Sequence, residues 1–254
     1  MGRIDKEQIG KTFARHYGQY HDAAVVQRDM ADRLAAALQQ AAPQLGVERA
    51  LEIGIGTGFL TRLLTARFPH AEWWFNDLTP AAFDWIPVGL KQALTLPGDA
   101  ETLPYPHGLD LLASASALQW FEDIEKNFFP KAHGVLNTGG VLAVATFGER
   151  HFHELTAVAG GTLHYHSAAE LQSMAEAVGF RVLHTEAWEH TLRFADARAL
   201  LDHLRRTGVN GGAARRISTP AQLRAFEAAY RAQFPAADAS LPLTYHAVLL
   251  VATR

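Results

Sequence analysis

Three glycines alternate with other residues directly after a short apolar run, at Gly54, Gly56 and Gly58. Glycine has no Cβ and tolerates positive φ, so a strand can turn sharply into a helix and leave open space above the turn. An enzyme uses such a loop where its backbone must pass close to a small adenosyl ligand. We expect this loop, including Thr57, to bind the ligand, and we expect Glu52 to contact the loop backbone or an amino-acid portion of the ligand. A carboxylate satisfied at the end of a strand is the alternative interpretation of Glu52.

The spacing of the glycines separates two kinds of adenosyl cofactor. A dinucleotide fingerprint, G-x-G-x-x-G, requires its third glycine at position 59, which is Phe59 here. About 20 residues further on, Asp77 and Leu78 end a second apolar run, where a carboxylate can accept hydrogen bonds from both ribose hydroxyls. Capping of the next helix is the alternative role of Asp77. The pattern therefore disfavours a nicotinamide oxidoreductase.

The glycine loop and its preceding acid resemble motif I of the class I S-adenosylmethionine-dependent methyltransferases. Asp99, Ala100 and Glu101 resemble that family's D-A-E-x-L-P loop, in which an acid meets the adenine amino group. Ser116 follows the fourth strand-like run, where the resemblance implies that the methyl group faces the substrate. These elements at four successive strand ends predict S-adenosylmethionine as the cofactor, and we include Gln27 among the residues that bind it.

Segments near both ends of the chain resemble a narrower family, the malonyl-acyl-carrier-protein O-methyltransferases of biotin synthesis. Residues 13–27 match its F-x-x-x-x-x-x-Y-D-x-x-A-x-V-Q pattern, with His21 where the family usually has Asp, so the role of that position is open. The resemblance continues at residues 30–34, 118–120, 204–211 and 243–246, and therefore spans nearly the whole chain. The T-G-V-N-G run at 207–211 is its most selective part, because other methyltransferases have no reason to carry it there.

The resemblance implies methyl transfer to the free carboxylate of a malonyl thioester, carried on acyl carrier protein or on coenzyme A, at the start of pimeloyl synthesis. A malonate carboxylate is ionised at neutral pH and is already a nucleophile, so no general base is required. We therefore expect no catalytic acid–base residue, because the protein mainly supplies proximity and alignment. Two alternatives stay open: methylation of a small carboxylic acid or a quinone, and a non-catalytic methyltransferase-like binding protein.

Arginine is concentrated in residues 193–239, a segment with eight arginines, no lysine and four acidic residues. Its net charge is +4, whereas the rest of the chain carries −7. A basic segment on an acidic chain favours a local anionic partner, and carrier proteins are acidic. We expect five of these arginines to dock the carrier or to hold the carboxylate: Arg198, Arg205, Arg206, Arg215 and Arg216. An ordinary solvated helix face is the alternative. We expect Tyr20 and Trp120 to close the pocket, with ordinary aromatic core as their alternative.

Composition disfavours several other classes of protein. The 254 residues contain no cysteine, which excludes disulfides and fits a cytoplasmic protein, and the net charge of −3 disfavours nucleic-acid binding. No run of about 18 apolar residues predicts a membrane span, and residues 1–8 lack the apolar segment of a secretory signal. His151 and His153 are two residues apart, as are His164 and His166, a spacing that does not fit a helical metal site; we expect no metal.

The glycine loop and the acids must be positioned by alternating strands and helices. Apolar patterns predict strands at residues 49–53, 72–76, 93–96, 109–114, 141–147, 181–188 and 245–252. Helices are predicted at residues 4–42, 58–68, 80–86, 124–136, 195–207 and 219–234, and a capping box at Ser167 opens another that ends near Gly179. This alternation predicts a parallel, doubly wound sheet.

The resemblance implies a Rossmann-like α/β fold with a seven-stranded sheet whose last strand is antiparallel. We expect an N-terminal helical cap at residues 1–46 and an S-adenosylmethionine-binding core at residues 47–194 and 240–254. Residues 195–239 would form a helical lid, inserted before the last strand, over the edge of the sheet where open α/β sheets bind ligands.

Overall fold

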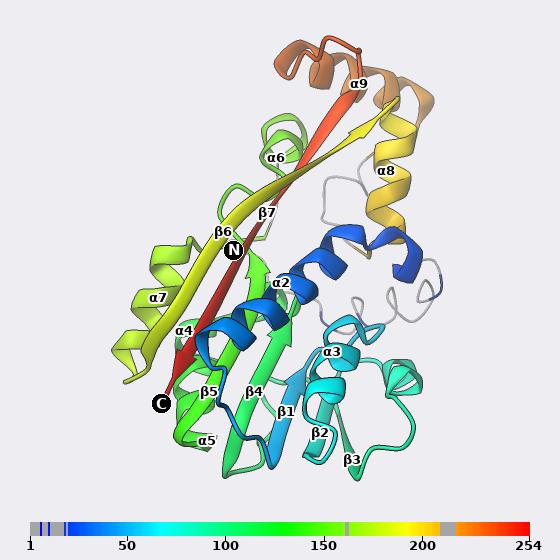
Figure 1. Cartoon of the computed structure of the whole chain (residues 1–254). Coiled ribbons are helices and arrows are strands. Elements are labelled where there is room, and N and C mark those ends of the chain that lie inside the picture. Colours follow the sequence, from blue (N-terminus) through cyan, green and yellow to red (C-terminus); the bar gives the residue numbers. More distant parts are fainter. Residues whose placement is uncertain (1–5, 7–9, 11–17, 19, 161–162, 209–216) are drawn as a thin grey trace.

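The computed structural model describes residues 6, 10, 18, 20–160, 163–208 and 217–254. Within these residues the centre is a seven-stranded sheet of order β3-β2-β1-β4-β5-β7-β6 (Figure 1). Its strands are β1 (Arg49–Ile53), β2 (Glu72–Asp77), β3 (Gln92–Pro97), β4 (Leu109–Ala115), β5 (Leu136–Phe147), β6 (Arg181–Phe194) and β7 (Leu241–Thr253). β1 to β5 are parallel to one another, whereas β7 is antiparallel to both of its neighbours. The predicted seven-stranded sheet with an antiparallel last strand is confirmed.

Helices pack on both faces of this sheet because its central strands alternate apolar side chains between two cores. The core that contains Ala50 and Leu111 is covered by α2 (Val25–Ala41) and α3 (Phe59–Arg67). The core that contains Leu51 and Leu112 is covered by α4 (Ile124–Asn127), α5 (Phe129–Val135) and α7 (Ala168–Ala177). The carboxyl ends of the parallel strands stay between these layers, which is where the sequence places the glycine loop.

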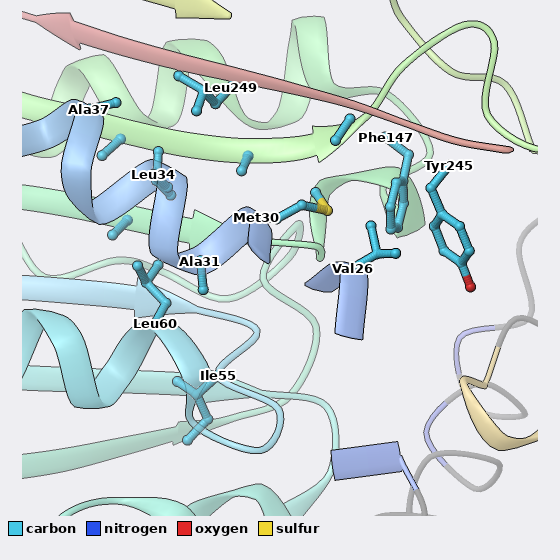
Figure 2. Close-up of a cluster of buried hydrophobic side chains, with 14 of the residues drawn as sticks. Val26, Met30, Ala31, Leu34, Ala37, Ile55, Leu60, Phe147, Tyr245 and Leu249 are labelled. Carbon is cyan, nitrogen blue, oxygen red and sulfur yellow. The ribbon is translucent and has the colours of Figure 1, made fainter. Parts of the chain in front are cut away.

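The α2 helix lies across the sheet and leads toward that edge (Figure 2). Val26, Met30 and Leu34 are fully buried and recur at helical spacing, so they lie on one face of the helix. Figure 2 shows Met30 above the strand ends and Val26 beside Phe147 and Tyr245. The end of α2 that is nearest the carboxyl edge therefore forms one wall of the space there.

The helix predicted at residues 4–42 is interrupted in the part that the structure describes. Residues 20–23 are helical, but Ala24 has φ −84° and ψ 51°, and α2 begins only at Val25. The interruption lets His21 stack between Phe59 and Trp85, with ring centroids 4.8 Å from each. A tertiary contact therefore overrides the continuous helical pattern.

Other boundaries also differ from the predicted ones. The helix predicted at 124–136 is two helices, because Pro130, at the second position of α5, has no N–H to continue the hydrogen-bond ladder from α4. β5 begins at Leu136, and the helix predicted at residues 80–86 is the 3-10 helix η1 (Pro80–Trp85). A second 3-10 helix, η2 (Leu118–Trp120), and α6 (His153–Ala159) follow strand ends and carry no strong periodicity.

The long β6 and β7 strands extend past the rest of the sheet and carry α8 (Ala197–Arg206) and α9 (Pro220–Gln233) beyond its carboxyl edge (Figure 1). Leu200 and Leu204 of α8 and Tyr230 of α9 are fully buried in the core shared with α2. The Tyr230 hydroxyl donates a 2.6 Å hydrogen bond to the Pro242 carbonyl of β7. These contacts fix where the two helices stand; the division of the chain into cap, core and lid stays a prediction.

No helix in the described part of the chain is long and apolar enough to cross a membrane.

Candidate cofactor pocket

The chain turns from β1 into α3 through three residues that adopt positive φ, at 69° for Gly54, 52° for Gly56 and 72° for Gly58. A Cβ on Gly54 would lie 2.4 Å from the Cβ of Ala117, which is far inside van der Waals contact. A Cβ on Gly58 would lie 3.2 Å from the Trp85 carbonyl oxygen. Gly54 and Gly58 are therefore required both by backbone conformation and by the close approach of neighbouring segments, whereas Gly56 is required by its conformation alone.

The glycine turn forms the floor of a pocket at the carboxyl ends of β1, β2 and β4. The predicted site residues that line it are Tyr20, Gln27, Glu52, Gly54, Gly56, Thr57, Asp77, Leu78, Asp99, Ala100, Ser116 and Trp120. Parallel strands bring their carboxyl ends to one edge, which is why residues from five parts of the sequence meet here. Lining residues that were not predicted include Lys6, Phe59, Asn76 and Ala117.

Asp77 ties the end of β2 to the glycine turn. One carboxylate oxygen accepts a 3.0 Å hydrogen bond from the Gly56 N–H, and the other accepts a 2.8 Å hydrogen bond from the Thr79 N–H. The capping alternative therefore describes part of what Asp77 does. Carboxylate oxygens accept more than one hydrogen bond each, so this bracing is compatible with the predicted contact to ribose hydroxyls.

Glu52 is buried at the strand end, only 2% exposed, and its Oε2 has no hydrogen-bond partner in the described residues. Burial raises the pKa of Glu52 to about 8; the nearby Asp77 carboxylate adds to this effect and the Thr61 hydroxyl partly offsets it. A buried carboxylate without a partner is costly unless a ligand satisfies it. The pocket wall thus offers a site for a positively charged group.

Asp99 and Glu101, which follow β3, are held by a lysine that we did not predict. Lys6 Nζ lies 2.9 Å from both carboxylate oxygens of Asp99 and also pairs with Glu101. Glu101 accepts further hydrogen bonds from the Glu122 and Asp123 N–H groups, and together these donors hold the pKa of its carboxyl below its usual value despite its burial. Glu101 therefore braces the following loop, whereas Asp99 faces the pocket.

Tyr20 and Trp120 lie on the pocket wall, and burial beside Asp77 raises the pKa of Tyr20 well above its usual range. The arginines lie elsewhere. Arg198, Arg205 and Arg206 are exposed on α8 and are not among the described residues that line the pocket. Arg215 and Arg216 lie outside the described residues, as does most of the T-G-V-N-G run.

The paired histidines do not converge on a metal site. His151 is buried, stacked between Phe147 and Phe152 with centroids 3.9 and 3.8 Å away, and burial lowers its pKa well below the usual value. In the chain segments that the structure describes, no group of three or more His, Cys, Asp or Glu side chains could hold an ion.

Comparisons with known proteins identify the class to which this fold belongs. Residues 50–140 match a family model described as a methyltransferase domain. Among solved structures, a putative methyltransferase from Bacillus halodurans aligns with a TM-score of 0.64 at 17% identity, covering 87% of this chain and 97% of its own. The YcgJ protein from Bacillus subtilis aligns with a TM-score of 0.62 at 16% identity, covering 88% and 98%. At these identities the likeness establishes the fold alone.

Curated relatives define the family more narrowly. The malonyl-[acyl-carrier protein] O-methyltransferase of Prosthecochloris aestuarii is 36% identical over 97% of this chain and 92% of its own length. The protein of the same name from Haemophilus influenzae is 32% identical over 98% and 95%. That from Bacteroides fragilis is 34% identical over 97% of this chain, which spans only 50% of its length. The chain belongs to the malonyl-[acyl-carrier protein] O-methyltransferase family, and the predicted O-methyltransferase class, whose methyl donor is S-adenosylmethionine, is confirmed.

The packing of Gly54 on Ala117 predicts a steric cost for any side chain at position 54. Gly54→Ala combines overpacking with a left-handed conformation, and should lower the free energy of unfolding by about 2–4 kcal/mol. Gly139→Ala is the matched control, because Gly139 also has positive φ (81°) but no atom lies within 4 Å of its added Cβ. Urea unfolding should show a cost of only about 1 kcal/mol for this control. Equal losses of unfolding free energy in the two variants would contradict the close packing of Gly54 on Ala117.

The raised pKa of Glu52 predicts proton release when a cationic ligand binds. Below about pH 8 the free carboxyl is mostly protonated, whereas an ammonium group beside it favours the ionised form. Affinity for S-adenosylhomocysteine should therefore rise with pH up to about 8, and Glu52→Gln should abolish that dependence. Calorimetry at about pH 6.5, in buffers of different ionisation enthalpy, should detect close to one proton released by the wild type and none by the variant. No proton release from the wild type would refute this linkage.

Proposed function

We propose that this protein transfers a methyl group from S-adenosylmethionine to the free carboxylate of a malonyl thioester on acyl carrier protein. The observation that carries the proposal is the near full-length match to relatives that bear this activity in their names. The pocket supports it, because glycines at the close approach and a buried carboxylate with one unpartnered oxygen suit an adenosyl ligand with an ammonium group. We further propose that the methyl ester begins pimeloyl synthesis for biotin, in the cytoplasm.

The residues of the pocket fit the cofactor in one orientation. Glu52 would hold the ammonium group, Asp77 the ribose hydroxyls and Asp99 the adenine amino group, while the glycine turn lies under the nucleoside. Lys6 occupies both oxygens of Asp99, so adenine binding would share or displace that ion pair. When bound, S-adenosylmethionine supplies an electrophilic methyl group on a sulfonium sulfur.

The methyl transfer requires little from the protein beyond alignment of the donor and the acceptor. A malonyl carboxylate is ionised at neutral pH, and one of its oxygens can displace the sulfur in line without any proton transfer. Tyr20 and Trp120 would exclude water and confine the carboxylate near Ser116 at the end of β4. Correct placement can account for a large share of rate acceleration in a reaction of this type.

The exposed face of α8 provides a docking surface for an acidic carrier. Arg198 and Arg205 are seven residues apart and so lie on the same side of the helix, with Arg206 beside them. Arg205 is 3.5 Å from Asp202, and both side chains are half exposed, so this pair is weak. Because α8 stands beyond the carboxyl edge of the sheet (Figure 1), a carrier bound there could extend its thioester toward the pocket, and residues 195–239 would act as the lid.

The substrate assignment is tested by offering the purified protein labelled methyl donor with malonyl-carrier protein, malonyl-coenzyme A and free malonate. We expect a base-labile methyl ester on the thioesters, with the highest kcat/KM for the carrier form, and none on free malonate. Equal turnover of free malonate would favour the small-molecule alternative. Cofactor binding without turnover of any acceptor would favour a non-catalytic role.

The docking surface predicts a defect specific to the carrier. Arg205→Glu combined with Arg206→Glu should raise KM for malonyl-carrier protein about tenfold and weaken its salt dependence, because charge attraction to the carrier is reversed. KM for malonyl-coenzyme A should change much less. Arg181→Glu, an exposed arginine at the opposite end of β6, is the control and should behave as wild type. An unchanged carrier KM in the double variant would rule out this surface.

A further inference from the structure

The turn that follows β4 is held in an unusual conformation beside the pocket. Ser116 has φ 59°, and it shares positive φ with only two other non-glycine residues in the described part of the chain, Phe152 and Ala239. Such conformations persist only where the surroundings enforce them, and they gather at functional sites. Ser116 lines the pocket and lies at the strand end where the methyl group is expected, so what enforces its conformation bears on the reaction.

Three elements hold Ser116. Its N–H donates a 2.9 Å hydrogen bond to the Ala145 carbonyl of β5, and its hydroxyl lies 3.4 Å from the sulfur of Met30 on α2. Its own carbonyl, which the positive φ turns back along the chain, accepts a 2.6 Å hydrogen bond from the Gln119 side-chain amide. That last bond closes the turn, and the side chain that makes it also bonds to β5.

Gln119 is itself fixed from the other side. Its amide oxygen accepts a 3.2 Å hydrogen bond from the Thr146 hydroxyl, and Thr146 is buried in β5. The amide therefore joins the end of β5 to the reversed carbonyl after β4. Gln119 is not among the described residues that line the pocket, whereas Ser116, Ala117 and Trp120 on either side of it are.

We propose that Gln119 is a positioning residue for methyl transfer, which holds the Ser116–Trp120 wall of the pocket against the glycine turn. Ala117 couples this wall to the glycine turn by direct packing. A Cβ added to Gly54 would lie only 2.4 Å from the Ala117 Cβ. The inference rests on the proposed function, since it assigns a role in aligning the acceptor carboxylate with the donor. This role requires the Gln119 amide nitrogen to donate a hydrogen bond to the Ser116 carbonyl. A side chain of the same size that cannot donate this bond would not suffice.

The test measures the single-turnover rate on malonyl-carrier protein together with the dissociation constant of S-adenosylhomocysteine. Gln119→Ala should slow the single-turnover rate about 10–100-fold, because misplacement by a fraction of an ångström is costly, while the dissociation constant stays within about twofold. Gln119→Glu keeps the size and the acceptor for Thr146 but removes the donor, and should be as slow as Gln119→Ala. A wild-type rate in Gln119→Glu would overturn the proposal.

Two further variants separate positioning from general destabilisation. Thr146→Val should slow the reaction about threefold and Thr146→Ser should restore it, because only the hydroxyl matters for the amide. A glycine at position 116 would adopt positive φ without the hydrogen bond from Gln119. Combining Ser116→Gly with Gln119→Ala should therefore raise the rate about tenfold relative to Gln119→Ala alone. No recovery would overturn the claim that Gln119 acts through the Ser116 backbone.

Gln172→Ala is the matched control, since Gln172 also donates a side-chain amide bond, to Glu176 on the remote helix α7, and should behave as wild type. If the wild-type protein methylates no thioester, the proposed function fails. If it does and Gln119→Ala is equally fast, the present inference alone fails.

Discussion

Gly54 and Ala117 touch where the carboxyl ends of β1 and β4 lie side by side, and this contact leaves no room for a Cβ on the glycine turn. The turn therefore depends on glycine for two separate reasons, its positive φ and the neighbouring segment. The same contact links the glycine turn to the Ser116–Trp120 wall, which we propose faces the acceptor. Because interiors are close-packed, a shift on one side must be felt on the other. Asp77 adds a second brace by accepting a hydrogen bond from Gly56.

Electrostatics then decides what the rigid pocket can bind. Glu52 is buried without a partner for one oxygen, and burial raises its pKa because it disfavours the charged form of the carboxyl. At the other end Asp99 already has a cation beside it, in Lys6. The pocket is therefore asymmetric: Glu52 can pair with a positive charge at one end, whereas Asp99 at the other end is already paired with Lys6. A ligand that carries an ammonium group at one end and a neutral base at the other matches this pattern.

Much of this site could be predicted because its signals are local. The glycine spacing, Asp77 and Asp99 each follow an apolar run, and parallel strands bring such positions together without further information. Lys6 could not be predicted, because its partners lie 93 and 95 residues away and a single lysine carries no pattern. Glu101 was predicted to bind the cofactor, yet its neighbours after η2 engage its carboxylate, and sequence does not reveal such loop contacts.

The fold shows the same division between local and tertiary causes. The bounds of β1 were predicted correctly from its apolar run, whereas the interruption at Ala24 follows from the stacking of His21 and has no local signal. The break before α5 does have a local signal, which is Pro130. We nevertheless predicted one continuous helix there from the helical pattern of residues 124–136. Helical spacing places Arg198 and Arg205 on one face of α8, but only the long β6 and β7 strands determine that α8 stands beyond the pocket edge.

The claim on which the others depend is that Glu52 faces the amino-acid end of the bound cofactor. Its most direct test compares S-adenosylhomocysteine with 5′-methylthioadenosine, which lacks the amino-acid group, in the wild type and in Glu52→Gln by calorimetry. The wild type should prefer S-adenosylhomocysteine strongly, and Glu52→Gln should lose most of that preference while binding 5′-methylthioadenosine nearly unchanged. If the variant weakened both ligands equally, Glu52 would act through the loop and the orientation argued for the pocket would be wrong.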